Sequence, residues 1–190
     1  MRVITGSARG YKLKSPDGLD FRPTADAVKE AMFSAVQFEI EGRVVLDLFS
    51  GSGQLGVEAL SRGAKKVVFV DNDKKSIDIT GYNVEKTGSS NKAEIFYQPN
   101  MTFLKNTSEV FDLAFLDPPY ELKLIQKTLP LLTEKMSEIG VIVCEHEKGL
   151  KLPEHENGFS IYKTYKKGKT EITIYRRTEI NEDGDISGQL

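Results

Sequence analysis

Between residues 43 and 145, short apolar runs alternate with segments of helical periodicity, and this alternation constrains the fold more than any other feature. The apolar runs predict strands at 43–48, 66–70, 94–97, 111–116 and 141–145. Helices are predicted between them at 53–62, 74–86, 101–105 and 122–136. Strands that alternate with helices form a mostly parallel sheet with helices on both faces. The sequence therefore predicts a doubly wound α/β fold.

The two flanks of this alternation have a different pattern. Before it, alternating apolar residues predict a short β-hairpin at 1–13, and helical spacing predicts a helix at 26–38. After it, two β-rich runs at 159–165 and 170–176 predict an antiparallel hairpin. The expected organisation is an N-terminal extension at 1–24, one domain at 25–178 and an acidic tail at 179–190.

Composition restricts the classes of protein to which the chain can belong. Its 190 residues suit a single domain. Its formal net charge of -2 lacks the strongly basic character that by itself would indicate a nucleic-acid partner. Cys144 is the only cysteine, which excludes an intramolecular disulfide and a cysteine zinc cluster and fits a reducing compartment. No run approaches the roughly 20 apolar residues of a membrane span. We expect a cytoplasmic monomer without a metal.

The first predicted strand leads into a glycine-rich loop. The residues from Gly51 to Gly56 contain G-x-G-x-x-G between a strand and a helix, which permits a tight turn and close approach of a ligand. Asp71 ends the next strand, where a carboxylate can accept both hydroxyls of an adenosine ribose. This pattern fits a dinucleotide, S-adenosylmethionine, or a glycine turn without a ligand.

Asp47, just before this loop, distinguishes between the two cofactors. A carboxylate is unfavourable beside a pyrophosphate. It is favourable beside the ammonium and sulfonium groups that S-adenosylmethionine brings to this position. The sequence therefore predicts S-adenosylmethionine as the cofactor.

The fourth predicted strand runs directly into Asp117-Pro118-Pro119-Tyr120, the strongest single signal in the chain. The prolines fix the loop and leave backbone carbonyls that the sheet does not pair. Asp117 and such a carbonyl can accept hydrogen bonds from an amino group and orient its lone pair. The amino nitrogen of a base is a poor nucleophile, so placement is the main contribution a protein can make. Tyr120 offers a face for an extruded base, although an inert Pro-Pro turn is the alternative.

These blocks resemble the class I, Rossmann-like methyltransferases with a [D/N]-P-P-[Y/F/W] motif. The N-terminal residues 1–6 and 22–33, the glycine loop and the Asp117 block further resemble the RsmD family, over roughly residues 1 to 177. The resemblance implies a seven-stranded, mostly parallel sheet with an antiparallel last strand. It also implies that S-adenosylmethionine is the cofactor and that the enzyme methylates the N2 amino group of a guanine in 16S ribosomal RNA.

The motifs and the resemblance together give the candidate site residues. The catalytic candidates are Asp117, Pro118, Pro119 and Tyr120. The cofactor-binding candidates are Asp47, Phe49, Gly51, Gly53, Asp71, Asn72, Asn100 and Met101. The RNA-binding candidates are Arg9, Lys12, Arg22 and Thr24. Where the family often has an Asp-Ala pair at the adenine, this chain has Pro99-Asn100, so Asn100 or the Met101 amide is expected there. Asn72 and Asp73 can each cap the following helix, and Asn72 can also reach the adenine.

Three functions remain open from the sequence. The favoured one is methylation of 16S ribosomal RNA, within the small subunit or an assembly intermediate. DNA adenine-N6 and protein glutamine-N5 methyltransferases reuse the motif. However, no separate DNA-recognition domain fits this chain, and the glutamine enzymes typically have Asn at the position of Asp117. The third is a non-catalytic RNA-binding or assembly protein, which the intact motif disfavours.

Overall fold

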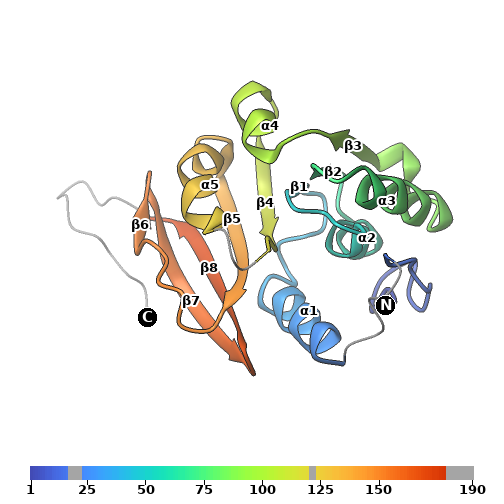
Figure 1. Cartoon of the computed structure of the whole chain (residues 1–190), viewed down its shortest axis with the longest axis horizontal. Coiled ribbons are helices and arrows are strands. Elements are labelled where there is room, and N and C mark those ends of the chain that lie inside the picture. Colours follow the sequence, from blue (N-terminus) through green and yellow to red (C-terminus); the bar gives the residue numbers. More distant parts are fainter. Residues whose placement is uncertain (17–22, 120–122, 179–190) are drawn as a thin grey trace.

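One sheet organises the computed structural model, which describes residues 1–16, 23–119 and 123–178 (Figure 1). Its strands are β1 (Val44–Asp47), β2 (Lys66–Asp71), β3 (Ala93–Tyr97), β4 (Phe111–Leu116), β5 (Met136–Glu147), β6 (His155–Glu156), β7 (Phe159–Lys167) and β8 (Thr170–Arg177). They follow the order β3-β2-β1-β4-β5-β8-β7-β6. Strands β1 to β5 are parallel, and β8 lies antiparallel between β5 and β7. The expected parallel sheet with a terminal antiparallel hairpin is confirmed, and β6 adds a short eighth strand at the edge.

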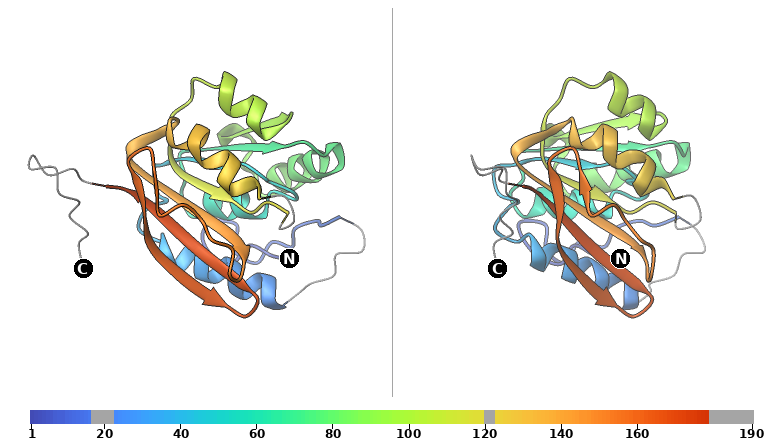
Figure 2. Two further views of the ribbon diagram at one scale, coloured as in Figure 1. Left: turned by 60° about the vertical axis from the view of Figure 1, so that its left-hand side comes forward. Right: turned by 90° about the vertical axis from the view of Figure 1, so that its left-hand side faces the viewer.

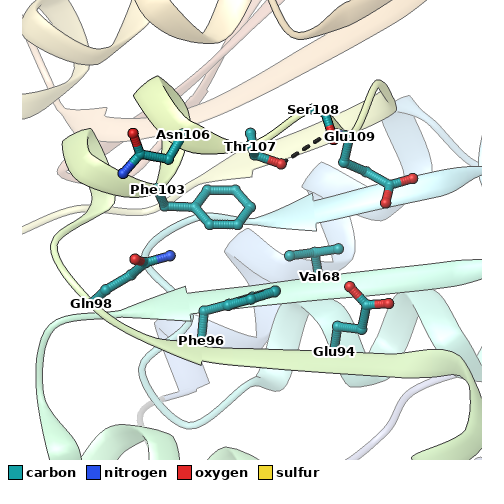
Figure 3. A pocket seen from close by; sticks show the side chains of 9 residues that line it. All are labelled: Val68, Glu94, Phe96, Gln98, Phe103, Asn106, Thr107, Ser108 and Glu109. Carbon is teal, nitrogen blue, oxygen red and sulfur yellow. Dashed lines mark hydrogen bonds between the residues drawn. The ribbon is translucent and has the colours of Figure 1, made fainter.

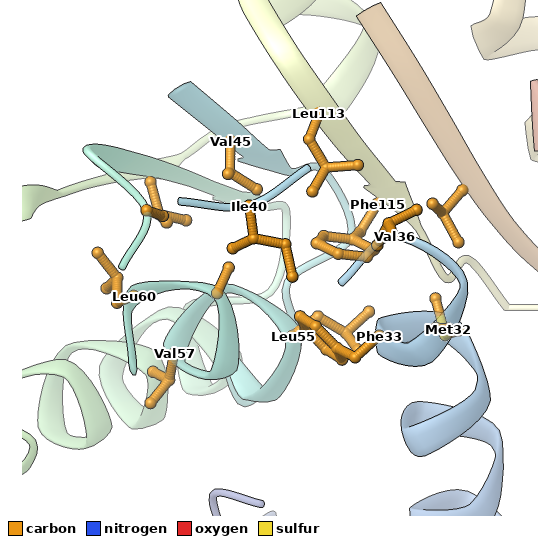
Figure 4. Close-up of a cluster of buried hydrophobic side chains, with 14 of the residues drawn as sticks. Met32, Phe33, Val36, Ile40, Val45, Leu55, Val57, Leu60, Leu113 and Phe115 are labelled. Carbon is orange, nitrogen blue, oxygen red and sulfur yellow. The ribbon is translucent and has the colours of Figure 1, made fainter. Parts of the chain in front are cut away.

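Helices cover both faces of the sheet, as expected (Figure 2). They are α1 (Pro23–Ala35), α2 (Gln54–Ser61), α3 (Lys74–Lys86), α4 (Asn100–Asn106) and α5 (Leu124–Thr133). Residues of α1, α2 and α3 share one apolar cluster with the sheet, in which the rings of Phe33 and Phe115 lie 5.1 Å apart (Figure 4). Residues of α4 and α5 form the cluster on the other face. None of the helices in the described ranges is long and apolar enough to cross a membrane.

Several element boundaries differ from the sequence prediction. Helix α1 begins at Pro23 rather than at residue 26, because the fixed φ of proline suits the first helical position. Helix α5 ends at Thr133, whose hydroxyl donates to the carbonyl of Leu129 at 2.9 Å. The chain then enters β5 at Met136, five residues earlier than the predicted strand at 141–145.

The N-terminal segment pairs with itself less than a regular hairpin does. One antiparallel bridge joins Arg2 to Lys12, and the amides of Val3, Gly10 and Leu13 donate to the carbonyls of Tyr11, Val3 and Met1. The segment also packs on α2. The fully buried carboxylate of Glu58 accepts the amide hydrogens of Ile4 at 2.7 Å and Thr5 at 3.0 Å. These amides therefore bond to a helix side chain instead of a partner strand, which explains the short pairing. Arg22, Tyr120, the side chain of Thr24 and the tail at 179–190 lie outside the described residues.

Candidate active site

The carboxyl edge of the sheet brings together residues that are far apart in the sequence. The strand order changes direction at β1, which has β2 on one side and β4 on the other. Ligands of doubly wound sheets bind where this change occurs, outside the carboxyl ends of the strands. Asp47 ends β1, Asp71 ends β2 and Asp117 directly follows β4. The structure thus places three predicted site residues together at this edge of the sheet, and we call their position the crevice.

The glycine loop has the conformation that its sequence requires. Gly51 and Gly53 have φ values of 51° and 73°, in the left-handed region that side chains rarely adopt. The Gly51 amide donates to Asp71 Oδ2 at 2.8 Å, and the other oxygen of Asp71 accepts from the Asp73 amide at 2.9 Å. These bonds fix the plane of the Asp71 carboxylate and leave each oxygen a further lone pair for a ribose hydroxyl.

Two side chains of α3, which the motifs did not reveal, hold the same loop from the outside. The Thr80 hydroxyl donates to the Gly51 carbonyl at 2.9 Å. The amide nitrogen of the buried Asn83 donates to the Ser52 carbonyl at 2.8 Å and to the Lys14 carbonyl at 2.9 Å. The loop is therefore preorganised by protein contacts before any ligand arrives. No local sequence signal marks Thr80 or Asn83, because their partners are distant in the chain.

Gly56, the third glycine, lets α2 approach the sheet. A Cβ atom at this position would lie 2.1 Å from the ring of Phe69. We expect Gly56→Ala to lower the free energy of unfolding by about 2 kcal/mol, because a buried ring must move. Urea unfolding measures this change, with Gly81→Ala in α3 as the control, since its nearest neighbouring atom would be 4.0 Å away. Equal stability of the two variants would contradict this role for Gly56.

Asp47 is the most deeply buried acid of the site. Its carboxylate is 1% exposed and accepts the Gly56 amide hydrogen at 2.9 Å. The pKa of Asp47 is raised from its ordinary value to about 7, chiefly by burial and also by the negative charge of Asp71, while the hydrogen bond from Gly56 opposes both effects. A bound cation would restore the ionised form. This environment suits the ammonium and sulfonium groups that the sequence predicts here.

Asp117 lies in a second acidic environment at the same edge. It is partly buried and is followed by the buried Pro118 and the exposed Pro119. Burial raises the pKa of the Asp117 carboxyl well above its usual range, and the charges of Glu145 and Asp47 raise it further. Glu145, near the end of β5, was not among the predicted site residues. Asp47, Asp117 and Glu145 together make the crevice a site that favours positive charge.

Three buried polar atoms around the crevice test whether the residues present fit S-adenosylmethionine. Within the described ranges, Ser50 Oγ, Gln54 Oε1 and Asn100 Oδ1 are buried and make no hydrogen bond. Unpaired buried polar atoms are costly and call for a ligand or water. A hydroxyl donor suits a carboxylate, and the Asn100 acceptor suits the amino group of adenine. The residues present therefore fit the amino-acid and adenosine parts of the cofactor.

The remaining cofactor candidates lie around the same crevice at different depths. Phe49 is partly buried against the α4–α5 cluster. Asn72 is exposed, and Asp73 instead caps α3 by accepting the Ser76 amide at 2.9 Å. The sulfur of Met101 accepts the Thr128 hydroxyl at 3.8 Å. Asn72 is therefore free of the capping role that was one of its two expected uses.

A hollow of about 340 Å³ lies between β3 and α4, beside the crevice (Figure 3). Its lining residues are Val68, Glu94, Phe96, Gln98, Phe103, Asn106, Thr107, Ser108 and Glu109. The rings of Phe96 and Phe103 stand 5.2 Å apart, and the Gln98 amide donates to the Asp71 carbonyl at 3.0 Å. Asp117 is not among the residues that line this hollow. No group of three or more metal-ligating side chains occurs in the described parts of the chain.

A basic and aromatic surface covers α3 and the N-terminal segment. The ammonium groups of Lys14 and Lys86 each lie 5.6 Å from the centroid of the half-exposed Tyr82 ring. Lys86 also donates to the carbonyl of Lys12 at 3.0 Å, and Lys75 lines a hollow of about 360 Å³ beside Lys14. We name this set of residues the α3 surface: Lys12, Lys14, Lys75, Tyr82 and Lys86. Of the RNA-binding candidates, Lys12 belongs to it, and Arg9 is exposed on the same N-terminal segment.

Comparison with known proteins identifies the family. The family described as Conserved hypothetical protein 95 matches residues 1–176. Ribosomal RNA small subunit methyltransferase D of Haemophilus influenzae is 38% identical over 181 residues, which cover 93% of this chain and 92% of that protein. The solved structure of yhhF from Escherichia coli has a TM-score of 0.84 at 31% identity, covering 93% of this chain and 97% of that chain.

A more distant structure has the same fold. SMU.776 complexed with SAH has a TM-score of 0.69 at 15% identity, covering 89% of this chain and 58% of that chain. The fold is therefore that of the Rossmann-like methyltransferases, as the sequence predicted. Because the family match spans nearly the whole chain, this protein belongs to the RsmD family.

Proposed function

We propose that this protein methylates the exocyclic N2 amino group of a guanine in 16S ribosomal RNA. The observation that carries the proposal is the position of Asp117, which follows β4 beside the cofactor-facing acid Asp47. A relative that covers almost the whole chain is named a ribosomal RNA small subunit methyltransferase. The guanine N2 atom is proposed from the resemblance of the N-terminal block to the RsmD family.

The protein's own contribution to the reaction is orientation. When bound, S-adenosylmethionine supplies a methyl carbon that the amino nitrogen attacks as the carbon–sulfur bond breaks. Asp117 and a carbonyl of its Pro-Pro loop accept the two amino hydrogens, which turns the nitrogen lone pair out of conjugation with the ring. Pro118 is buried and fixes this loop. We propose Tyr120 as the stacking face for the base.

The acidity of the site also provides for the released proton. A positive charge beside Asp117 favours its ionised form, which is the form that accepts the amino hydrogen bonds. After transfer, the methylated nitrogen carries an extra proton and is strongly acidic. Asp117, whose pKa is raised by burial and by Glu145, can take this proton and pass it to solvent.

We propose that the α3 surface and Arg9 bind the RNA backbone, together with Arg22 and Thr24. Lysine side chains contact phosphates, and an exposed aromatic ring between them can stack an unpaired base. We further propose that the protein acts as a cytoplasmic monomer on the small subunit or an assembly intermediate. In this arrangement residues 1–24 form the extension, residues 25–178 the catalytic domain and residues 179–190 the tail.

The α3 surface gives a prediction that is separate from the chemistry. We expect the double variant Lys14→Glu and Lys86→Glu to raise KM for the RNA about tenfold or more, because two phosphate contacts become repulsive. The kcat value and the affinity for S-adenosylmethionine should stay the same. Initial rates at several salt concentrations measure this, and the matched control is Lys105→Glu with Lys127→Glu on the opposite face. Equal effects of the two pairs would remove the α3 surface from RNA binding.

The substrate is tested by transfer of a labelled methyl group. The protein is incubated with labelled S-adenosylmethionine and, separately, with free 16S RNA, small subunits, duplex DNA and protein. Label in the RNA or the subunits that digests to N2-methylguanosine supports the proposal. Label only in DNA or protein would instead support the adenine-N6 or glutamine-N5 alternative. Binding to RNA without transfer to any substrate would support a non-catalytic role.

A further inference from the structure

Glu145 lies directly beside Asp117 on the neighbouring strand. Leu116 of β4 and Cys144 of β5 are register partners, so the residues that follow them are neighbours at the carboxyl edge. Parallel strands are about 4.8 Å apart, and successive side chains point to opposite faces. Leu116 and Cys144 both face the α4–α5 cluster. The side chains of Asp117 and Glu145 therefore point to the same face, toward α1 and α2.

The charge of Glu145 reaches the reacting position. Glu145 is partly buried, and among the charges that raise the pKa of Asp117 its contribution is larger than that of Asp47. Strand β1 lies on the other side of β4 from β5, and its residue Asp47 is in register with Phe115 of β4. The Asp47 side chain therefore points to the same face of the sheet as those of Asp117 and Glu145. Asp117 thus lies between a carboxylate beside the glycine loop and one on the side away from it. The second carboxylate has no part in the cofactor site described above.

The edge of a guanine presents a pattern that matches two neighbouring carboxylates. Guanine carries adjacent donors, the N1–H group and the N2 amino group. Adenine and 2-aminopurine have a hydrogen-bond acceptor at N1. Enzymes that extrude a base read this edge through hydrogen bonds. A carboxylate accepts a hydrogen bond from guanine N1–H, whereas N1 of adenine or 2-aminopurine presents a lone pair that repels it. A carboxylate has two oxygens, so one oxygen can accept from guanine while the other keeps a partner within the protein.

We propose that Glu145 accepts the N1–H of the target guanine while Asp117 accepts from its N2 amino group. Glu145 is then a specificity-determining residue that selects guanine among bases carrying a reactive amino group. This inference rests on the proposed function. It assigns to one side chain the discrimination of the base, which the Asp-Pro-Pro motif alone does not provide, since that motif also serves adenine and glutamine.

The test changes the hydrogen-bonding groups of the target base, by replacing guanine with 2-aminopurine, and those of the protein, by the substitution Glu145→Gln. The best RNA substrate from the transfer assay is rebuilt by ligation with guanine or with 2-aminopurine at the target nucleotide. We expect the original protein to prefer guanine about 100-fold in kcat/KM, because an unpaired acceptor faces a carboxylate in 2-aminopurine. In Glu145→Gln the amide can donate to N1 of 2-aminopurine, so the preference should fall to about tenfold or less. Fluorescence of the 2-aminopurine RNA measures binding independently of transfer.

Glu147→Gln is the matched control, because Glu147 is exposed on the same strand and the same face. It should keep the full preference for guanine. A common loss of activity on both substrates in Glu145→Gln, with an unchanged ratio, would overturn the inference and leave guanine methylation intact. An equal rate on both bases in the original protein would overturn it as well. Absence of N2-methylguanosine with every RNA would instead refute the proposed function on which it rests.

Discussion

Replacing Asp117 by Ala is expected to lower kcat about 1,000-fold while the dissociation constant for S-adenosylmethionine changes less than threefold. The variant loses the acceptor that orients the amino group, and removing one such preorganised contact typically costs two to three orders of magnitude. The residues proposed to hold the cofactor, the glycine loop with Asp47 and Asp71, keep their mutual hydrogen bonds in this variant. Single-turnover methyl transfer and calorimetric titration of the cofactor measure the two quantities separately.

Asp117→Asn is the control for this prediction, since it keeps an acceptor oxygen at the same position. It should retain more activity than Asp117→Ala, by roughly tenfold or more. Full activity of the alanine variant would remove Asp117 from the chemistry. A parallel loss of cofactor binding and of kcat would assign the residue to the cofactor site instead.

Asp47→Asn is expected to make the protein without cofactor more stable and to weaken binding of S-adenosylmethionine on the order of 100-fold. The pKa of Asp47 is about 7 in the folded chain and 3.8 in the unfolded chain, so the folded state binds more protons between these values. Stability therefore falls as the pH rises from about 4 to 7, and the full penalty applies above pH 7. Removing the charge should raise the free energy of unfolding by about 2 kcal/mol at pH 8.

Urea unfolding of the two proteins at pH 8 and at pH 4 measures this effect. The stability difference should be largest at pH 8 and should shrink toward pH 4, where Asp47 is protonated in the folded chain and roughly half protonated in the unfolded chain. Asp112→Asn is the control, because Asp112 also accepts a backbone amide hydrogen, that of Val44, but lies at the opposite end of β4 from Asp117. A difference that does not depend on pH would show that the buried charge is not its cause.

The sequence predicted the parts of this molecule that depend on local patterns. Apolar runs located the five parallel strands, and the loops at Gly51 and Asp117 were found because each motif lies within a few neighbouring residues. Contacts between distant residues were missed. Thr80 and Asn83 are ordinary polar residues of a helix until the fold brings them to the glycine loop. Glu145 becomes notable only through the register of β4 with β5.

The N-terminal hairpin shows the same limit in another form. Alternation correctly indicated extended chain, but it does not reveal which acceptors an extended chain will use. Here the Glu58 carboxylate accepts the amide hydrogens of Ile4 and Thr5, so these two residues do not pair across the expected hairpin. Glu58 also bonds Arg62 at 2.8 Å and lies 3.6 Å from the buried ammonium of Lys29. This buried ion cluster fixes the segment against two helices.

The way the N-terminal segment is anchored has a consequence for biosynthesis. The segment leaves the ribosome well before its anchors, since Glu58 comes 54 positions after Ile4 and Asn83 comes 69 positions after Lys14. Contacts between such distant positions form late, because a long loop of chain must close first. Residues 1–14 therefore cannot dock until the chain has been made as far as α3. The surface that carries Lys12 and Lys14 is completed only after the glycine loop and α3 have been made.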